Sequence, residues 1–341
     1  MSRHSTAGER MTTRHVVLLT YGEPPTPSFL EQLRYSWRIL LGLTRSVAPI
    51  PLALLPIVAL SRARFRRQLW SRERYGSPLE RITCDQAEGV RLALVTRSPD
   101  VMWKLHVAYE FRDPLLIPKL ESLPSNAAID IVPMYVADSA FTHEISRRTI
   151  GEWKRLAQGR SGPVRVLPAL DEDALVEASA RHIERQLDAR GIRGREWALV
   201  LAAHGTLLDP PRPMETGRAA TERICHGIVR RLEDRFGTIA NGWLNHVYGG
   251  RWTVPPVEEA LQRVAGAGYR RVVYYPFGFL ADNAESELEG RIALRTQPCL
   301  EAIHLRCLNA DPDFLDMLAA HIADSVDSLE RRVPDPTLRF S

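Results

Sequence analysis

The sequence predicts an α/β protein made of two Rossmann-like domains, each a four-stranded parallel sheet flanked by helices. Three observations support this prediction. Short apolar runs alternate with amphipathic stretches, the same sequence pattern occurs in both halves, and 341 residues suit about two domains of roughly 150 residues each.

Eight β-rich apolar runs are the predicted strands, and they span 15–21, 104–109, 129–135, 164–167, 198–203, 242–248, 271–276 and 303–308. Stretches of helical period lie between most of them, for example 174–189, 219–236, 257–267 and 314–326. Strand, helix and strand in this order are typical of parallel sheets with helices on their faces.

The two halves share landmarks at the ends of their strands. HVVLLTYGEP contains Tyr21, and WALVLAAHGT contains His204 about 183 positions later. IVPMYVADSAF around Pro133 resembles VVYYPFGFLADNAE around Pro276, about 143 positions later. The first half therefore holds roughly 40 extra residues, which we assign to an insertion at 36–75, named the lip.

The lip is strongly basic and partly apolar. It carries eight arginines against the single acid Glu73, a net charge of +7, so the other 301 residues sum to −3 within the total of +4. Its apolar stretch, 46–60, is 15 residues long and contains three prolines. This is shorter than the about 20 residues of a spanning helix, so 46–67 is either a segment that binds an anionic membrane surface or a buried segment with a basic flank.

The composition and the absence of several motifs exclude some classes of protein. The four cysteines, Cys84, Cys225, Cys299 and Cys307, form no C-x-x-C pair, so we expect a reducing cytoplasm and no iron–sulfur cluster. The polar start shows no secretory signal. Signatures of serine hydrolases, P-loop NTPases and nicotinamide enzymes are absent, and no nucleic-acid module is recognisable. The predicted organisation is a tail at 1–14, domains at 15–168 and 169–330, and a tail at 331–341.

Candidate metal-binding side chains gather in the second half. His204 follows an apolar strand, and Asp282, Glu285 and Glu289 are spaced i, i+3 and i+7, which aligns them on one face of an α-helix. The alternative is an N-terminal cap with first-turn glutamates that complement the helix dipole. An imidazole with a carboxylate suits Fe²⁺, Co²⁺ or Zn²⁺, and its open coordination positions suit a metal that is handed on.

Taken together, these motifs resemble the ferrochelatases, which insert Fe²⁺ into a porphyrin in haem biosynthesis. The resemblance spans 16–314 and rests on VVLLTYGEPPTPSFLEQL, YGSPLERIT, PMYVADS, AAHG, W-x-x-P, GFLADNAESELE and CLNADPDF. It implies two chelatase-type domains without a dinucleotide and an apolar lip over a cleft. It also implies that His204 and Glu285 share metal delivery and proton removal, with Asp282 and Glu289 extending the acidic line.

The same resemblance implies a porphyrin site. Tyr21 corresponds to its wall and Ser77 to a loop bordering it, while Arg112 is a substitute for the family's arginine, whose usual position holds Glu110. Tyr135 begins a stretch that departs from the family pattern, as do Thr206, Leu207, Asn283 and the segment 245–247.

The expected activity is a ferrochelatase acting on protoporphyrin IX, with Fe²⁺ as substrate and no permanently bound cofactor, in the cytoplasm or at the inner face of the membrane. Coproporphyrin III as substrate, a cobalt or nickel chelatase, and a non-catalytic porphyrin- or haem-binding homologue are the alternatives.

Overall fold

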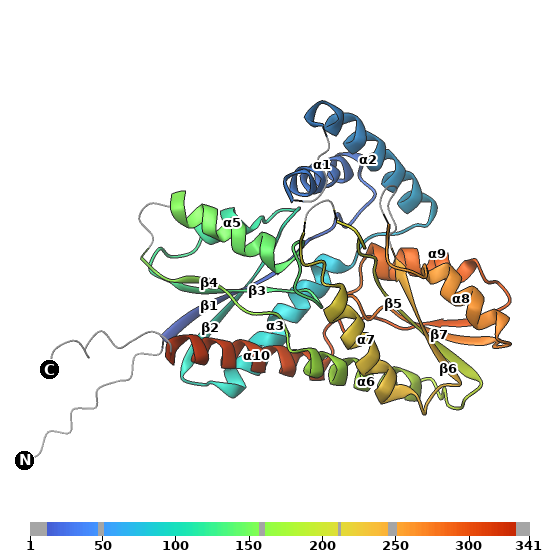
Figure 1. The fold of residues 1–341 in the computed structure, drawn as a ribbon. Coiled ribbons are helices and arrows are strands. Elements are labelled where there is room, and N and C mark those ends of the chain that lie inside the picture. Colours follow the sequence, from blue (N-terminus) through green and yellow to red (C-terminus); the bar gives the residue numbers. More distant parts are fainter. Residues whose placement is uncertain (1–11, 47–50, 157–160, 211–212, 245–250, 332–341) are drawn as a thin grey trace, which may run out of the picture.

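Two parallel sheets organise the molecule (Figure 1). The computed structural model describes residues 12–46, 51–156, 161–210, 213–244 and 251–331. The first sheet has the order β2-β1-β3-β4, with β1 (Thr12–Thr20), β2 (Val101–Tyr109), β3 (Ala128–Pro133) and β4 (Val164–Val166). The second has the order β6-β5-β7-β8, with β5 (Trp197–His204), β6 (Thr238–Leu244), β7 (Arg271–Tyr275) and β8 (Glu301–His304). The predicted fold class is confirmed.

The central strands are buried because helices cover both faces of each sheet. In β5 every residue before His204 is buried, and the last six residues of β1 are buried as well. Strand β6 begins four residues earlier than predicted, and its Gly242 lies under α8 (Val257–Gly266), where an added Cβ would come within 2.7 Å of the Val257 backbone. Residues 245–248 of the predicted strand lie outside the described residues.

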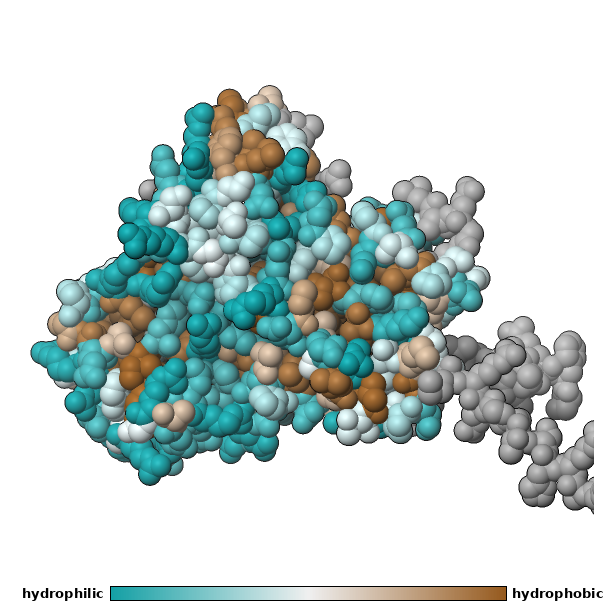
Figure 2. Space-filling model, turned by 180° about the vertical axis from the view of Figure 1, so that it is seen from behind, coloured by the Kyte–Doolittle hydropathy of each residue, from teal (hydrophilic) through white to brown (hydrophobic). Residues whose placement is uncertain are grey.

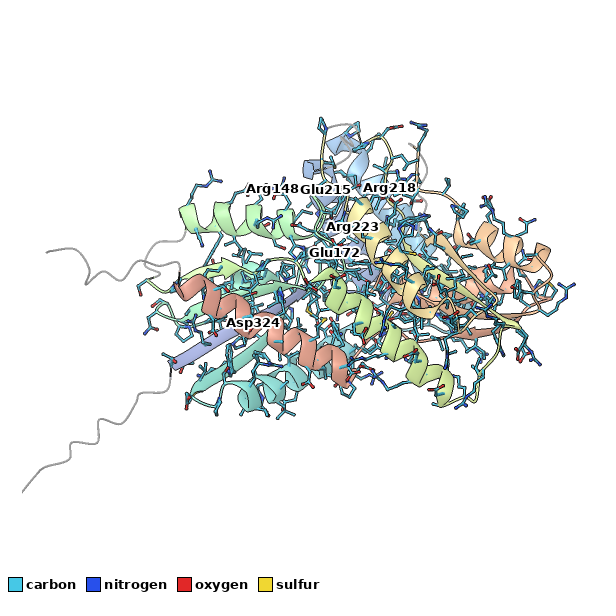
Figure 3. The ribbon with its side chains drawn as sticks, turned by 60° about the horizontal axis from the view of Figure 1, so that its bottom comes forward. Arg148, Glu172, Glu215, Arg218, Arg223 and Asp324 are labelled. Atoms are coloured by element: carbon cyan, nitrogen blue, oxygen red, sulfur yellow. The ribbon has the colours of Figure 1, made fainter. Side chains whose placement is uncertain are left out.

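One hydrophobic core is shared between the sheets. It is formed by α3 (Leu79–Arg97), α6 (Glu172–Asp188), α7 (Arg218–Leu232) and α10 (Pro312–Arg331), together with residues such as Leu18 of β1 and Leu201 of β5. Helix α10 packs against both α3 and α6. Arg223 of α7 also pairs with Glu172 at the start of α6, with Nη2 2.7 Å from Oε1 (Figure 3). The domain boundary at 168/169 stays a prediction.

Separate helices cover the outer faces. Helices α4 (Leu116–Glu121) and α5 (His143–Leu156) pack on the first sheet through Leu120, Ile150 and Trp153. Helices α8 and α9 (Gly290–Arg295) pack on the second through Leu261 and Ala293. The same strand order and a similar covering of helices thus occur twice.

The lip projects beyond the sheets as a pair of helices (Figure 1). It takes in the end of α1 (Phe29–Ser46), the short helix η1 (Leu52–Leu54) and α2 (Leu55–Arg72), with 47–50 outside the described residues. Pro56 stands in the first turn of α2, where proline costs no hydrogen bond.

The outer surface of the lip carries exposed apolar side chains. Leu40, Leu55 and Ala59 join α1 to α2, whereas Leu54, Ile57 and Phe65 are 48%, 65% and 64% exposed. Figure 2 shows hydrophobic surface at this end of the molecule. The lip is therefore not an ordinary buried core segment. None of the described helices is both long and apolar enough to cross a membrane.

Candidate active site

His204 ends β5 at the carboxyl edge of the second sheet. Its side chain is 47% exposed, in contrast to the buried residues that precede it. The imidazole Nδ1 lies 2.7 Å from Oε2 of Glu285, whose side chain is 21% exposed. The structure therefore brings together the two residues singled out as the metal pair.

Glu285 is held by a π-helical turn, η2 (Ala284–Glu289), that follows β7. The Asn283 side chain caps this turn by accepting hydrogen bonds from the amides of Glu285 at 2.8 Å and Ser286 at 3.1 Å. The Asn283 amide in turn donates to the Ser286 hydroxyl at 2.9 Å. This reciprocal cap fixes the start of the turn and the backbone of Glu285.

Each side chain of the pair stabilises the charged form of the other. Removal from water opposes the charged imidazole, but attraction to Glu285 outweighs it and raises the pKa of His204. Burial opposes the charge of Glu285 as well, but His204 lowers the pKa of that carboxyl. Burial and the negative charge of Glu285 raise the pKa of Glu289 to about 8. A divalent cation that binds here would take the place of the imidazole proton.

Asp282 does not join this acidic group, contrary to the expectation of three aligned acids. The turn begins after it, and its buried carboxylate accepts hydrogen bonds from the Cys307 amide at 2.8 Å, Arg306 Nη1 at 3.0 Å and Asn309 Nδ2 at 2.8 Å. Asp282 therefore anchors the loop before η2 to the segment after β8. Within the described part of the chain, Glu285 and Glu289 are the acids that act on His204.

No cluster of three or more metal-ligating side chains occurs among the described residues. The protein groups near a metal at this point are the His204 imidazole, the Glu285 carboxylate and the more distant Glu289. This set leaves coordination positions for other ligands, as a transferred metal requires.

Tyr21 follows β1 at the carboxyl edge of the first sheet. Its ring packs with Leu79, Ile82 and Ala281. It also lines a cavity of about 40 Å³ together with Tyr135 and Leu280, so the edges of both sheets meet there. Burial raises the pKa of Tyr21, and the charge of Glu285 contributes to that rise.

Ser77 and Arg112 are both engaged with protein groups. The Ser77 hydroxyl donates to Glu23 Oε2 at 2.7 Å. Arg112 donates to Glu80 of α3 and lies 3.4 Å from Glu31 of α1, so it braces the base of the lip. Their role as substrate-binding residues stays a prediction.

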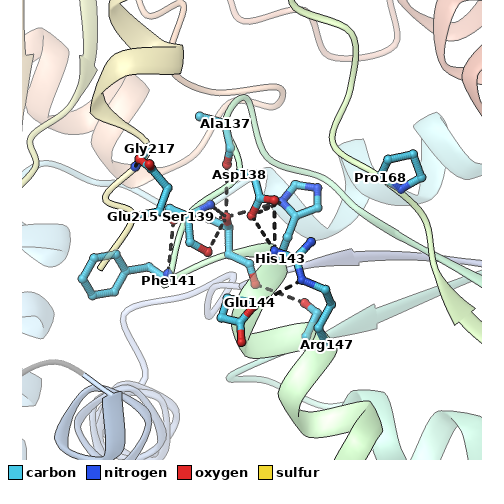
Figure 4. A network of polar contacts seen from close by, with 12 residues as sticks. Ala137, Asp138, Ser139, Phe141, His143, Glu144, Arg147, Pro168, Glu215 and Gly217 are labelled. Carbon is cyan, nitrogen blue, oxygen red and sulfur yellow. Dashed lines mark hydrogen bonds and ion pairs between the residues drawn. The ribbon is translucent and has the colours of Figure 1, made fainter. Parts of the chain in front are cut away.

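Tyr135 belongs to a loop that contacts the second half of the chain (Figure 4). Within that loop Asp138 pairs with Arg147 at 3.0 Å, and the Ala140 amide donates to the carbonyl of Glu215 at 2.8 Å. Gly217 has a φ of +76°, and an added Cβ would stand 3.1 Å from the carbonyl oxygen of Asp138. The loop that follows Tyr135 is therefore held by contacts between the two halves. The divergent segment 245–247 lies outside the described residues.

Two charged residues of the site, Glu23 and Arg62, were not singled out from the sequence, although Glu23 lies within the motif HVVLLTYGEP. Glu23 is 2% exposed and accepts hydrogen bonds from three separate segments. Its signal was a carboxylate three residues after a buried strand. Arg62 of α2 has a buried Nε without a hydrogen-bond partner in the described structure, and burial lowers its pKa while Glu285 and Glu289 oppose that change. Its signal was a charge next to the buried i, i+4 series Leu55, Ala59 and Ala63 of α2.

Comparisons with known proteins agree with this architecture. The family model described as Ferrochelatase matches residues 13–326. A Synechococcus ferrochelatase (strain JA-3-3Ab) is 24% identical over 327 residues, covering 91% of this chain and 93% of its own length. The mitochondrial ferrochelatase of Bos taurus is 22% identical over 354 residues, covering 95% and 80%.

Two solved structures share the fold. CbiX, described as the terminal enzyme of sirohaem biosynthesis in denitrifying bacteria, aligns with a TM-score of 0.51 and 14% identity, covering 92% of this chain and 99% of its own. A multi-domain Deinococcus radiodurans protein with structural similarity to chelatases aligns with a TM-score of 0.53 and 15% identity. That alignment covers 92% of this chain, which spans 55% of the Deinococcus protein.

Proposed function

The chain belongs to the ferrochelatase family, and from that membership and the His204–Glu285 pair we propose that it inserts a divalent metal into a porphyrin, with Fe²⁺ and protoporphyrin IX as substrates in haem biosynthesis. The observation that carries the proposal is the 2.7 Å contact between His204 Nδ1 and Glu285 Oε2. This pair stands at the carboxyl edge of a parallel sheet, where ligands of such folds bind.

Charge balance suggests how the reaction proceeds. Porphyrin metallation releases two N–H protons as the divalent metal enters, so the site must hold a cation and accept protons. The Glu285 carboxylate and the His204 imidazole hold the cation once the imidazole proton has left. With a pKa of about 8, Glu289 exchanges a proton near neutral pH, so it is the group suited to pass protons away from the pair.

The test is metal insertion followed by the shift of the Soret band. Wild-type protein mixed with Zn²⁺ or Fe²⁺ and protoporphyrin IX should give the metalloporphyrin spectrum, and His204→Ala should slow it severely. Undiminished metallation by His204→Ala would contradict the assigned role. Tight porphyrin binding without metallation by the wild type would instead indicate a porphyrin- or haem-binding homologue.

Arg62 favours coproporphyrin III as a second candidate substrate. The Nε of Arg62 is buried without a hydrogen-bond partner in the described structure, and a carboxylate of the substrate would supply one. The exposed side chains of Val58 and Phe65 lie at i−4 and i+3 from Arg62, so the same face of α2 offers an apolar surface beside the charge. A tetracarboxylate porphyrin presents a carboxylate at this place in any orientation.

The two porphyrins are distinguished by their steady-state constants. If coproporphyrin III is the substrate, its kcat/KM exceeds that of protoporphyrin IX, and Arg62→Gln raises its KM. Arg64→Gln, an exposed arginine on the same helix, is the matched control and should leave KM unchanged. Equal KM values for wild type and Arg62→Gln would exclude this contact.

We also propose that the lip binds an anionic membrane surface at the inner face of the membrane. Exposed Ile57 and Phe65 would enter the headgroup boundary while Arg64 and Arg67 face the lipid phosphates. Phe65→Glu should reduce flotation with vesicles that contain phosphatidylglycerol. Leu92→Glu, at an exposed apolar position on α3, is the control. Equal flotation by both variants would contradict the proposal.

A further inference from the structure

Glu23 joins three segments that are far apart in the sequence. It stands three residues after β1, and its Oε1 lies 3.3 Å from Arg66 Nη2 of α2. Its Oε2 accepts hydrogen bonds from the Ser77 hydroxyl at 2.7 Å and from the backbone amide of Ala284 at 3.0 Å. One buried carboxylate thus contacts the lip, the loop that follows it, and the turn that carries Glu285.

Arg66, which contacts Glu23 from the lip, is itself fixed by other side chains of α1 and α2. Arg66 Nε donates to Oε1 of the buried Gln32 at 2.9 Å. The guanidinium also lies over the rings of Tyr35, at 5.0 Å, and Trp70, at 4.8 Å. Arg66 is therefore fixed between α1 and α2, and Glu23 is the acid with which it forms an ion pair in the described structure.

The contact with η2 reaches the candidate metal pair directly. Ala284 is the first residue of that turn, and the next residue, Glu285, is the partner of His204. A carboxylate bound to a free amide at the start of a helical turn fixes the position of that end. A shift of α2 would be transmitted through Arg66, Glu23 and Ala284 to the backbone of Glu285.

We propose that Glu23 is a positioning residue that locks the lip to the Glu285 turn, so that divalent-metal affinity at His204 and Glu285 depends on the position of the lip. Coupling of this kind is reciprocal, so metal at the pair would also favour the lip position that binds the tetrapyrrole. The dependence of metal affinity on the lip rests on the proposed function. The contact that Glu23 makes between the lip and η2 does not depend on it.

The first experiment measures the lock without metal or porphyrin. Hydrogen exchange followed by mass spectrometry should show that Glu23→Gln raises exchange about tenfold in both 55–72 and 284–289, because a charged hydrogen-bond network is lost. Glu73→Gln is the matched control. It removes another contact between the lip and the second half, Glu73 Oε2 to Arg295 Nη2 at 2.7 Å, which does not involve η2. Faster exchange in only one of the two segments of Glu23→Gln would overturn the lock.

The second experiment measures metal affinity by the visible absorption of bound Co²⁺, with no porphyrin present. Glu23→Gln should weaken Co²⁺ binding about tenfold, and Glu73→Gln should leave it unchanged. Arg66→Lys, which keeps the charge but loses the two-pronged geometry, should weaken it in the same direction and serves if Glu23→Gln does not fold.

The outcomes separate the two proposals. Wild-type protein that binds Co²⁺ through His204 but metallates no porphyrin would refute the proposed function and leave the role of Glu23 standing. Folded Glu23→Gln with wild-type Co²⁺ affinity would refute the positioning role, even if the variant were less stable, because a purely structural brace predicts that result.

Discussion

The two sheets have the same strand order, but their carboxyl edges differ in chemistry. The edge of the first carries Tyr21, Tyr135 and the half-buried Glu110, whose pKa is raised to about 7 by partial removal from water. The edge of the second carries the His204–Glu285 ion pair. A repeated framework thus supports a mostly neutral, aromatic wall on one side and a charged, metal-suited pair on the other.

The loops that leave the sheets account for this difference. After β7, Asp282 and Asn283 hold a tight turn that directs Glu285 toward His204. After β3, the corresponding loop instead binds the second half of the chain through Ala140 and Glu215. The same strand order can therefore carry loops of different sequence, provided that hydrogen bonds hold each loop in place.

The largest expected difference between the two edges is in the rate of metal insertion. His204→Ala should lower the rate of metal insertion by about 100-fold or more, because a group that binds the metal and exchanges a proton is lost. Tyr21→Phe, at the corresponding position after β1, should stay within about tenfold of wild type. Similar losses in the two variants would show that both edges perform the chemistry.

The equivalence of the frameworks can be tested in the core. Leu18 and Leu201 occupy matching positions in β1 and β5, and both are fully buried in the shared core. We expect Leu18→Ala and Leu201→Ala each to lower the free energy of unfolding by about 2–5 kcal/mol, because each leaves a cavity. Denaturant titrations should show a single transition in both. A separate transition that Leu18→Ala leaves unchanged would mean that the halves unfold independently.

The two edges should also respond differently to pH. The raised pKa of His204 gives stability below the ordinary imidazole value of 6.5 that is lost as pH rises through the raised value. The lowered pKa of Glu285 gives stability above the ordinary value of 4.5 that is lost as pH falls through the lowered value. The destabilisation caused by Glu285→Gln should therefore be largest between pH 4.5 and 6.5, measured by denaturant titration.

Substitution of Glu110 on the first edge should change the stability in the opposite direction. Because its pKa is raised from 4.5 to about 7, the folded state loses stability as pH rises through that interval. Glu110→Gln should leave the protein unchanged at pH 4 and stabilise it above pH 7, in the same titrations. A stabilisation that does not vary with pH would contradict this explanation.

The smallest expected effect is at the surface. Arg223→Ala removes the ion pair with Glu172 between α7 and α6, where both partners are solvated (Figure 3). Exposed pairs contribute little, so its thermal unfolding should be indistinguishable from wild type. A clear loss of stability would show that the packing of α6 on α7 depends on this pair.

Much of the fold was accessible from the sequence because parallel strands buried on both faces are continuous apolar runs. All eight strands were predicted, but β1 and β2 begin three residues, β6 four residues and β8 two residues earlier than predicted. The first residues of these strands are mostly exposed or half-buried, so they do not continue the apolar run. The pairing of His204 with Glu285 followed from family resemblance. Residue spacing alone favoured an α-helical face that wrongly included Asp282.

The repeated α/β framework and the basic lip follow from the sequence alone, whereas the two residues that meet at the second edge were identified by family resemblance. The tertiary structure alone decided which carboxylates serve as anchors and which remain near the metal pair. Asp282 and Glu285 are only three positions apart, yet one accepts hydrogen bonds from donors after β8 and the other pairs with His204. Glu23 shows the same principle, since its partners lie 43, 54 and 261 positions away in the chain. The sequence shows where a charged side chain stands, but the folding of distant segments against one another decides which group it pairs with.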